Sequence, residues 1–189
     1  MSYAAQDRPE GRPARASPAQ ATPEVEPPFS EGCTTTREFI TALSFLREEK
    51  TLSLSENNAR QSALRVAKGC TGAARRSIDV TRLLLKVGMT GKDAVHWGET
   101  LAQRDDATTG TFLTVFRAAF AEDILNLDVK TALDLASSIS TELPNTADMR
   151  SVQKDFEEIL RFCVNTDDLD LPRPTCGRMA ARMARAAQP

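Results

Sequence analysis

A short pattern recurs four times in this sequence of 189 residues, and it constrains the fold more than any other feature. Each copy has an apolar residue followed by a residue that readily starts a helix. The four pairs are Leu54-Ser55, Met89-Thr90, Leu127-Asp128 and Leu171-Pro172. Ser, Thr and Asp accept a hydrogen bond from an unpaired amide of the first helical turn, and Pro is tolerated at a helix start. The pattern therefore predicts four helices that begin in the same way.

Small side chains follow each of these starting residues at fixed intervals. The fourth residue after each start is Ala59, Ala94, Ala132 or Cys176, the eighth is Ala63, Gly98, Ala136 or Ala180, and the eleventh is Val66, Leu101, Ile139 or Met183. Steps of four, four and three keep such residues on one face of a helix. Small residues on a contact face let two helix axes approach toward the short end of the usual range of about 8 to 10 Å. We therefore expect each of these helices to pack tightly against a partner helix.

The apolar residues from position 33 onward recur mostly at helical spacing, and no segment alternates as a strand does. We predict an all-α domain over residues 34–187, with about eight helices arranged as four hairpins. The predicted pairs are 35–49 with 56–69, 72–87 with 91–104, 107–124 with 129–142, and 146–164 with 173–186. Seven of the eight phenylalanines lie in the first helices of these pairs, where they supply core volume.

The four copies of the pattern are unevenly spaced along the chain, so two arrangements of the hairpins stay open. One is a short α-solenoid-like array of helical repeats, and the other is a compact hairpin bundle. The hairpin form is generically similar to tetratricopeptide-like arrays, but the signature of those arrays, Trp-x-x-Leu-Gly-x-x-Tyr, does not occur here.

Residues 1–33 differ from the rest of the chain in composition. Six of the ten prolines lie there, interleaved with Ala, Arg, Glu and Gln. Such a segment has too little apolar surface to offset the entropy lost on ordering, so we predict a disordered arm. The sequence shows neither the apolar core of a secretory signal near its start nor a run long enough to span a membrane. These features favour a cytoplasmic protein.

The formal charge of −2 gives no overall basic field, so any contact with nucleic acid must be local. Arg75 and Arg76 open the third predicted helix, and Arg178, Arg182 and Arg185 lie in the last one. These residues are candidates for binding phosphates or an anionic lipid surface. The alternative is that the basic helix is the polar outer face of a terminal hairpin.

The single histidine, His96, lies beside Trp97 and within one turn of Asp93 and Glu99. A histidine near a carboxylate can act as a general base, which makes His96 a candidate binding or catalytic residue. However, the sequence has no G-x-S-x-G, phosphate-binding glycine loop or H-E-x-x-H motif to accompany it. We therefore expect His96 to be structural or to contact a partner, and we expect neither a cofactor nor enzymatic activity.

The four cysteines admit two interpretations. The predicted hairpins bring Cys33 close to Cys70, and Cys163 close to Cys176, which allows two disulfides and implies an oxidising compartment. Alternatively the cysteines are reduced and buried, because Cys176 occupies a position that alanine fills in the other three copies of the pattern. A zinc site is disfavoured, since the chain has no C-x-x-C pair and only one histidine.

The function that these features favour is recognition of another protein. Stacked hairpins present an extended surface, and such surfaces generally serve in binding. We therefore predict a non-enzymatic protein-protein interaction module or scaffold. The alternative is a binder of nucleic acid or of an anionic membrane surface.

Overall fold

The structure is a computed structural model of the chain, and it describes residues 35–143, 148–165 and 171–187. This described part is all-α, as predicted, and contains no strand. Its elements are α1 (Thr35–Glu48), η1 (Lys50–Leu52, a single 3-10 turn), α2 (Glu56–Ala67), α3 (Ala73–Lys86), α4 (Gly91–Ala102), α5 (Asp106–Phe120), α6 (Val129–Ser138), α7 (Met149–Asn165) and α8 (Arg173–Ala186). The predicted arm of residues 1–33 lies outside the described residues.

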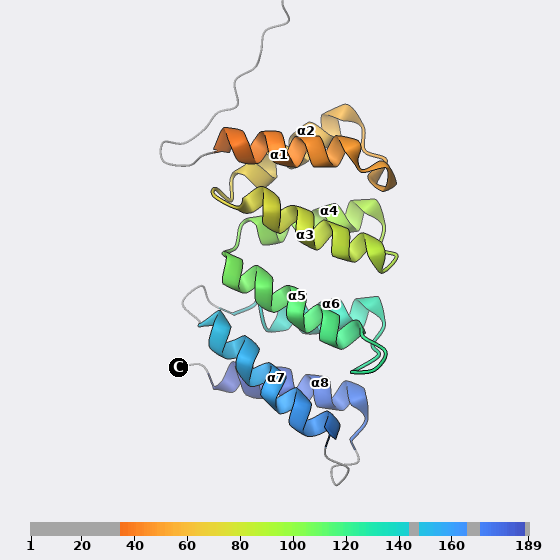
Figure 1. The fold of residues 1–189 in the computed structure, drawn as a ribbon, viewed down its shortest axis with the longest axis vertical. Coiled ribbons are helices and arrows are strands. Elements are labelled where there is room, and N and C mark those ends of the chain that lie inside the picture. Colours follow the sequence, from red (N-terminus) through yellow and green to blue (C-terminus); the bar gives the residue numbers. More distant parts are fainter. Residues whose placement is uncertain (1–34, 144–147, 166–170, 188–189) are drawn as a thin grey trace, which may run out of the picture.

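Consecutive helices pair as four hairpins, which are α1 with α2, α3 with α4, α5 with α6, and α7 with α8. We call these the first, second, third and last hairpins. They stack on one another along the long axis of the molecule, so that the odd-numbered helices form one layer and the even-numbered helices a second layer behind it (Figure 1). The result is a compact stack in which each hairpin contacts the next.

The predicted starts of the four second helices are confirmed, and three of them have a side-chain cap. The side-chain oxygens of Ser55, Thr90 and Asp128 each accept a hydrogen bond from the backbone amide three residues later, at 3.3, 3.3 and 3.1 Å. Each bond satisfies one amide of the first turn that lacks a helical partner. Helix α8 begins after Pro172 without a side-chain cap.

The small residues of the pattern are buried in all four hairpins, which confirms that they form the contact face. Gly98 shows how tight this contact is. A Cβ atom added there would lie 2.9 Å from the backbone oxygen of Ser77 and closer still to the hydroxyl of Thr81. Helices α3 and α4 are therefore closer together at this point than alanine would allow.

The eleventh position of the pattern follows the prediction in three hairpins and departs from it in the last. Val66, Leu101 and Ile139 are buried, but Met183 is 50% exposed. Leu171, the apolar residue before the start of α8, is also 38% exposed. Within the described residues, no further hairpin packs on the last one.

Helices α5 and α6 end about four residues earlier than predicted, for local reasons. After α5 the backbone becomes extended at Ala121, which lets Leu125 and Leu127 turn into the core. After α6 the hydroxyl of Ser140 bonds to the carbonyl of Ala136. Serine side chains that bond to nearby backbone compete with helix continuation.

The core consists of two clusters of buried apolar residues. The smaller one lies between the first and second hairpins, and the larger one extends from the second hairpin to the last. Three aromatic rings of the third hairpin, Phe112, Phe116 and Phe120, stack in a row along α5. The bulky side chains of the first helix of each hairpin and the small side chains on the contact face of the second helix together fill the interior of the stack.

Candidate functional site

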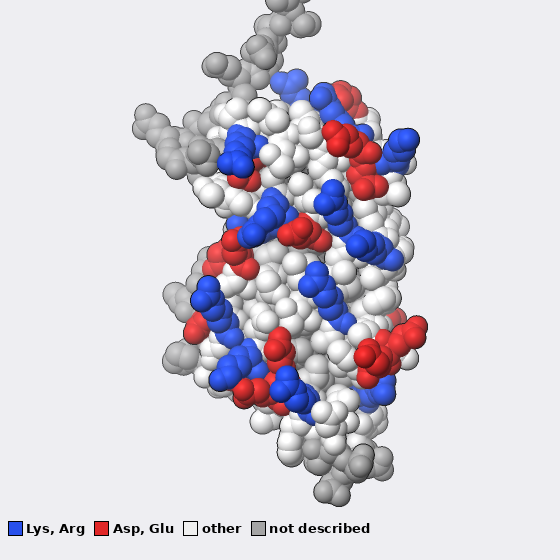
Figure 2. All heavy atoms as spheres, viewed as in Figure 1, with Lys and Arg blue, Asp and Glu red and all other residues white. Residues whose placement is uncertain are grey.

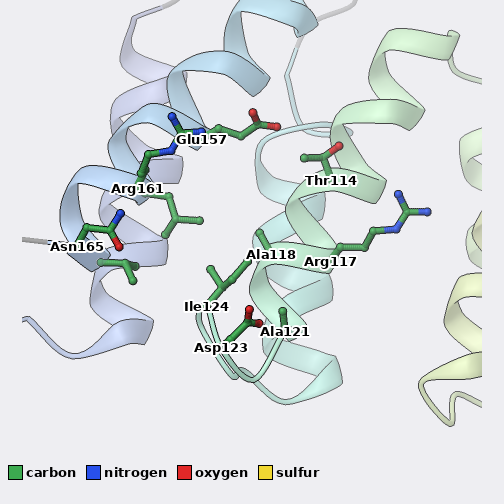
Figure 3. Close-up of a pocket in the computed structure, with 11 residues that line it drawn as sticks. Thr114, Arg117, Ala118, Ala121, Asp123, Ile124, Glu157, Arg161 and Asn165 are labelled. Carbon is green, nitrogen blue, oxygen red and sulfur yellow. The ribbon is translucent and has the colours of Figure 1, made fainter.

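A groove of about 550 Å³ runs between α5 and α7 on the odd-numbered layer. Its apolar lining comes from both helices and from the turn after α5, and consists of Ala118, Ala121, Ile124, Leu160 and Val164. Figure 3 shows Ile124 projecting into the space between the two helices, with Ala118 and Ala121 beside it. An apolar concave surface with a few polar groups is typical of binding sites.

Helices α5 and α7 are hydrogen-bonded to each other near their amino ends. Near the start of both helices, the hydroxyl of Thr111 donates a hydrogen bond to the carbonyl oxygen of Met149, at 3.0 Å. Toward their carboxyl ends the two helices diverge (Figure 1). Ala118 on α5 and Ala121 directly after it line this part of the groove, and both side chains are small.

Charged side chains flank the apolar lining on both sides. Arg117 and Asp123 belong to the α5 side, and Glu157 and Arg161 belong to α7 (Figure 3). None of these four forms an ion pair with another described residue. Glu157 accepts a hydrogen bond from Gln153 at 2.9 Å. The rim thus offers one acid and one base on each side for contacts with a partner.

The sequence prediction did not identify this groove. Ala118 and Ala121 follow the core residues Phe112, Val115 and Phe116 along the same helix, and nothing in that spacing indicates whether a neighbour covers them. A weak signal is present in the repeat of Thr114, Ala118 and Ala121 at helical spacing, which marks a face of small residues beside the core face.

Arg76 is buried, which contradicts its prediction as a surface contact. It is 6% exposed and contacts three segments, which are the loop between α2 and α3, the end of α4 and the start of α5. Its guanidinium donates hydrogen bonds to the carbonyl oxygens of Gly69, Thr71 and Ala102 and to Asp106 Oδ1, at 3.1, 3.1, 3.0 and 2.9 Å. Only its Nε has no partner. Arg76 therefore stabilises the junction between hairpins and does not face a ligand.

The neighbouring Arg75 is exposed, and it pairs with the same carboxylate. Its guanidinium donates a hydrogen bond to Asp106 Oδ2 at 2.7 Å. The hydrogen bond from Arg76, followed by that from Arg75, lowers the pKa of Asp106 below its ordinary value despite some opposing burial. Arg75 is thus on the surface as predicted, although its charge is partly compensated.

His96 is exposed on α4, and neither nearby carboxylate is positioned to orient it. Asp93 accepts a hydrogen bond from the hydroxyl of Thr90 at 2.7 Å. Glu99 pairs with Arg65 of α2, with 2.7 Å between Oε2 and Nε. Within the described residues, the imidazole makes no hydrogen bond to either carboxylate.

Three of the four arginines of α8 lie together on its exposed side. Arg178, Arg182 and Arg185 line a hollow of about 200 Å³ against Leu135 of α6. Arg185 lies 3.5 Å from Glu142, and Arg178 donates to the hydroxyl of Thr175. Arg75 belongs to α3 and this cluster to α8, and the third hairpin lies between the second and the last hairpins (Figure 1).

The face of the odd-numbered helices carries both signs of charge. Figure 2 shows basic and acidic side chains interleaved over this face, without a broad area of either sign. Such a surface does not produce the single-sign field that steers nucleic acids.

Cys163 and Cys176 are joined by a disulfide that links α7 to the start of α8, with 5.7 Å between their Cα atoms. Both residues are buried. Cys70 is also disulfide-bonded, while its predicted partner Cys33 lies outside the described residues.

In the described part of the chain, no three side chains of His, Cys, Asp or Glu gather in a way that suits a metal ion. None of the helices in that part combines the length and the apolar character of a membrane span. Comparison of the chain with protein-family models, with curated proteins and with solved structures finds no match.

Proposed function

We propose that this chain is a non-enzymatic protein-binding module whose groove between α5 and α7 receives an amphipathic helix of another protein. The observation that supports this is the apolar lining of the groove, flanked on both sides by charges without ion-pair partners among the described residues. A helix that lies in such a groove inserts apolar side chains at intervals of three and four residues. Its flanking charged residues then pair with Arg117, Asp123, Glu157 and Arg161.

The test is capture of a partner from an extract of the native host, with two charge-reversal variants compared. Arg161→Glu changes the groove rim, whereas Arg150→Glu makes the same change on the same helix at an exposed position outside the groove lining. We expect the first variant to lose the partner and the second to retain it. Equal capture by both variants would exclude the groove as the binding site. Recovery of a bound small apolar molecule instead of a protein would also reject the proposal.

A second candidate function rests on the three arginines that line the hollow on α8. Adjacent guanidinium groups around a hollow suit a phosphate or carboxylate group. If this site binds nucleic acid or an anionic membrane surface, its affinity must fall steeply as salt concentration rises. Affinity that does not change with salt would remove this candidate.

The sequence left two compartments open, the cytoplasm and an oxidising compartment. The disulfide between Cys163 and Cys176 supports the oxidising compartment. Disulfides persist in oxidising environments and are rare in the cytosol. We therefore propose that the protein works in an oxidising compartment. Recovery of the chain from its host with both thiols reduced would favour the cytoplasm instead.

A further inference from the structure

The first residues of α8 contact both walls of the groove between α5 and α7. One wall is α7, and the other consists of α5 and the turn that follows it. We call residues 173–177, which open α8, the α8 start. It belongs to the layer of even-numbered helices, behind the odd-numbered layer that carries the groove (Figure 1).

The disulfide attaches the α8 start to the α7 wall. Cys176 belongs to the α8 start, and its partner Cys163 lies near the carboxyl end of α7. Leu160, three residues before Cys163, and Val164, directly after it, both line the groove. Residues three apart are neighbours on the surface of a helix. The bridge therefore holds the part of α7 that lines the groove.

Two contacts attach the α8 start to the opposite wall. The guanidinium of Arg173 donates a hydrogen bond to the carbonyl oxygen of Glu122, at 2.7 Å. Gly177 lies so close to Leu125 that a Cβ atom added to the glycine would be 2.8 Å from Leu125 Cδ1. The two residues between Glu122 and Leu125 in the sequence line the groove. The α8 start thus holds the turn after α5 as well.

The hydrogen bond between Thr111 and Met149 joins the two walls directly, but it lies near the amino ends of α5 and α7. About three helical turns separate Met149 from Leu160. Near the carboxyl end of α7, one path between the walls runs through the disulfide and the α8 start to the turn after α5. The disulfide is the bond that attaches α7 to this path.

The spacing of the two sulfur atoms depends on this bond. Two thiols cannot pack as closely as two bonded sulfur atoms. Cys163, Cys176 and Leu125 are all at most 4% exposed. In a close-packed interior, a change in spacing is passed on to the neighbouring elements. Because the α8 start keeps its contacts with the turn after α5, we expect α7 to be the wall that moves.

We propose that the disulfide between Cys163 and Cys176 positions the α7 wall, so that the groove binds its partner helix only when this bridge is formed. This inference rests on the function proposed above for the groove, and it names the redox state of one cysteine pair as the control of binding. In the oxidising compartment proposed above, the bridge forms and the groove takes its binding shape.

Reduction of the bridge requires a dithiol as the electron donor. One thiolate of the dithiol attacks a sulfur of the bridge and forms a mixed disulfide, which the second thiol then resolves. Two electrons and two protons pass from the dithiol to the bridge, so the dithiol becomes a disulfide and both cysteines become thiols. Because both cysteines are buried, the exchange requires α7 and α8 to open, and in the test it is carried out on the unfolded chain before refolding.

The first test measures the width of the groove and does not require the partner. Spin labels at the exposed residues Asp123 and Arg161 mark the two walls, and pulsed electron paramagnetic resonance gives the distance between them. The labels are attached to keto-bearing amino acids, so the cysteines stay unmodified. Reduction should shift and broaden this distance, and reoxidation should reverse the change. The distance from Asp123 to a label at Lys86, on α3, should stay the same.

The measurement uses a chain in which Cys33 and Cys70 are replaced by alanine. The sequence has four cysteines, so the dithiol then acts on Cys163 and Cys176 alone. Before reduction this chain should show the wild-type distance between the two walls. Circular dichroism checks that the reduced chain refolds with the same helical content. An unchanged distance after complete reduction, verified by mass spectrometry, would overturn the inference.

A glycine substitution tests the α8 start with the bridge intact. Gly177→Ala places a methyl group against Leu125, so it should shift the distance between the labels at Asp123 and Arg161. Gly110→Ala adds a methyl group with no neighbour within 4 Å, and this control should leave the distance unchanged. Equal distances in the two variants would show that the α8 start does not place the walls, which would also overturn the inference.

The second test measures binding through a photoreactive side chain at Thr114, in the groove, in the native host. Replacing Cys163 and Cys176 by alanine should remove most of the cross-linked product with another protein. Replacing Cys33 and Cys70 by alanine should retain it. Equal yields from the two double variants would overturn the inference and leave the proposed function standing. If even the bridged chain gave no product, the proposed function would fail, and the distance between the walls would decide the positioning role of the bridge by itself.

Discussion

The carboxylate of Glu38, in α1, caps the first turn of α3 by accepting a hydrogen bond from the backbone amide of Ala74 at 2.8 Å. It also accepts one from the amide of Gly72 at 3.0 Å. Glu38 is buried, so these contacts are shielded from water. One side chain of the first hairpin thus satisfies two amides of the second, which ties the two hairpins together.

We expect Glu38→Ala to lower the free energy of unfolding by about 1 to 3 kcal/mol, because it leaves buried amides without a partner. Urea denaturation measures this change. Glu48→Ala, at an exposed position of the same helix, serves as the control and should change stability by less than about 0.5 kcal/mol. Similar losses in both variants would show that the cap does not stabilise the stack.

The same substitution at two helical glycines should have opposite effects. Gly98→Ala places a methyl group against Ser77 and Thr81 of α3, and it should destabilise by about 1 to 3 kcal/mol. Gly110→Ala adds a methyl group with no neighbour within 4 Å, and it should stabilise α5 by about 0.5 to 1 kcal/mol. Thermal unfolding of the two variants beside the wild type tests both signs. A stabilising effect at Gly98 would contradict the close packing of α3 and α4.

Two adjacent arginines that bond to one carboxylate should contribute very differently to stability. Arg76→Ala removes four hydrogen bonds of a buried guanidinium and should cost about 3 kcal/mol. Arg75→Ala removes an exposed ion pair and should cost less than about 1 kcal/mol. Chemical denaturation compares the two directly. An equal loss of unfolding free energy in the two variants would contradict the view that the buried hydrogen bonds of Arg76 stabilise the chain more than the exposed ion pair of Arg75.

Asp106 should make the stability of the chain sensitive to acid. Its pKa is lowered, chiefly by the hydrogen bond from Arg76. Such a group contributes stability above its unfolded pKa of about 3.9, and this contribution is lost as the pH falls through the lower pKa of the folded state. We therefore expect the free energy of unfolding of Asp106→Asn to fall less steeply in acid than that of the wild type.

The control for this measurement is Asp79→Asn, at an exposed position of α3 that forms no ion pair within the described residues. Denaturation curves recorded from neutral to strongly acidic pH should show the wild-type slope for this variant. An unchanged slope in Asp106→Asn would show that the contact with Arg76 does not persist in solution.

The disulfide between Cys163 and Cys176 closes a short loop between α7 and α8. A thiol-alkylating reagent should modify these two cysteines in the unfolded chain only after reduction, as detected by mass spectrometry. Bridges over loops of about 15 residues contribute about 3 kcal/mol, so replacing both cysteines by alanine should destabilise the chain by a similar amount. Alkylation without reductant would instead support the reduced, buried cysteines considered from the sequence.

The sequence predicts the helices and their pairing because both depend on local chemistry. The caps at Ser55, Thr90 and Asp128 and the small residues that follow them are readable from spacing alone. The ends of α5 and α6 were less predictable, since they depend on Leu125 turning into the core and on a side-chain bond of Ser140.

The candidate site could not be predicted in the same way, because it depends on how hairpins are placed relative to one another. The groove exists because α5 and α7 diverge beyond Thr111, and no local pattern sets that divergence. Arg76 was expected to contact a partner because it and Arg75 are adjacent basic residues that open the third predicted helix. Its burial follows from the carbonyl oxygens of Gly69 and Ala102, which only the folded stack brings together.

The most direct test of the proposed function is site-specific photo-cross-linking in the native host. A photoreactive side chain placed at Thr114, in the groove, should form a covalent product with another protein. The same side chain at Gln61, on the exposed polar side of α2, should not. A product that contains only this chain, equal products from both positions, or no product from Thr114 would contradict the account.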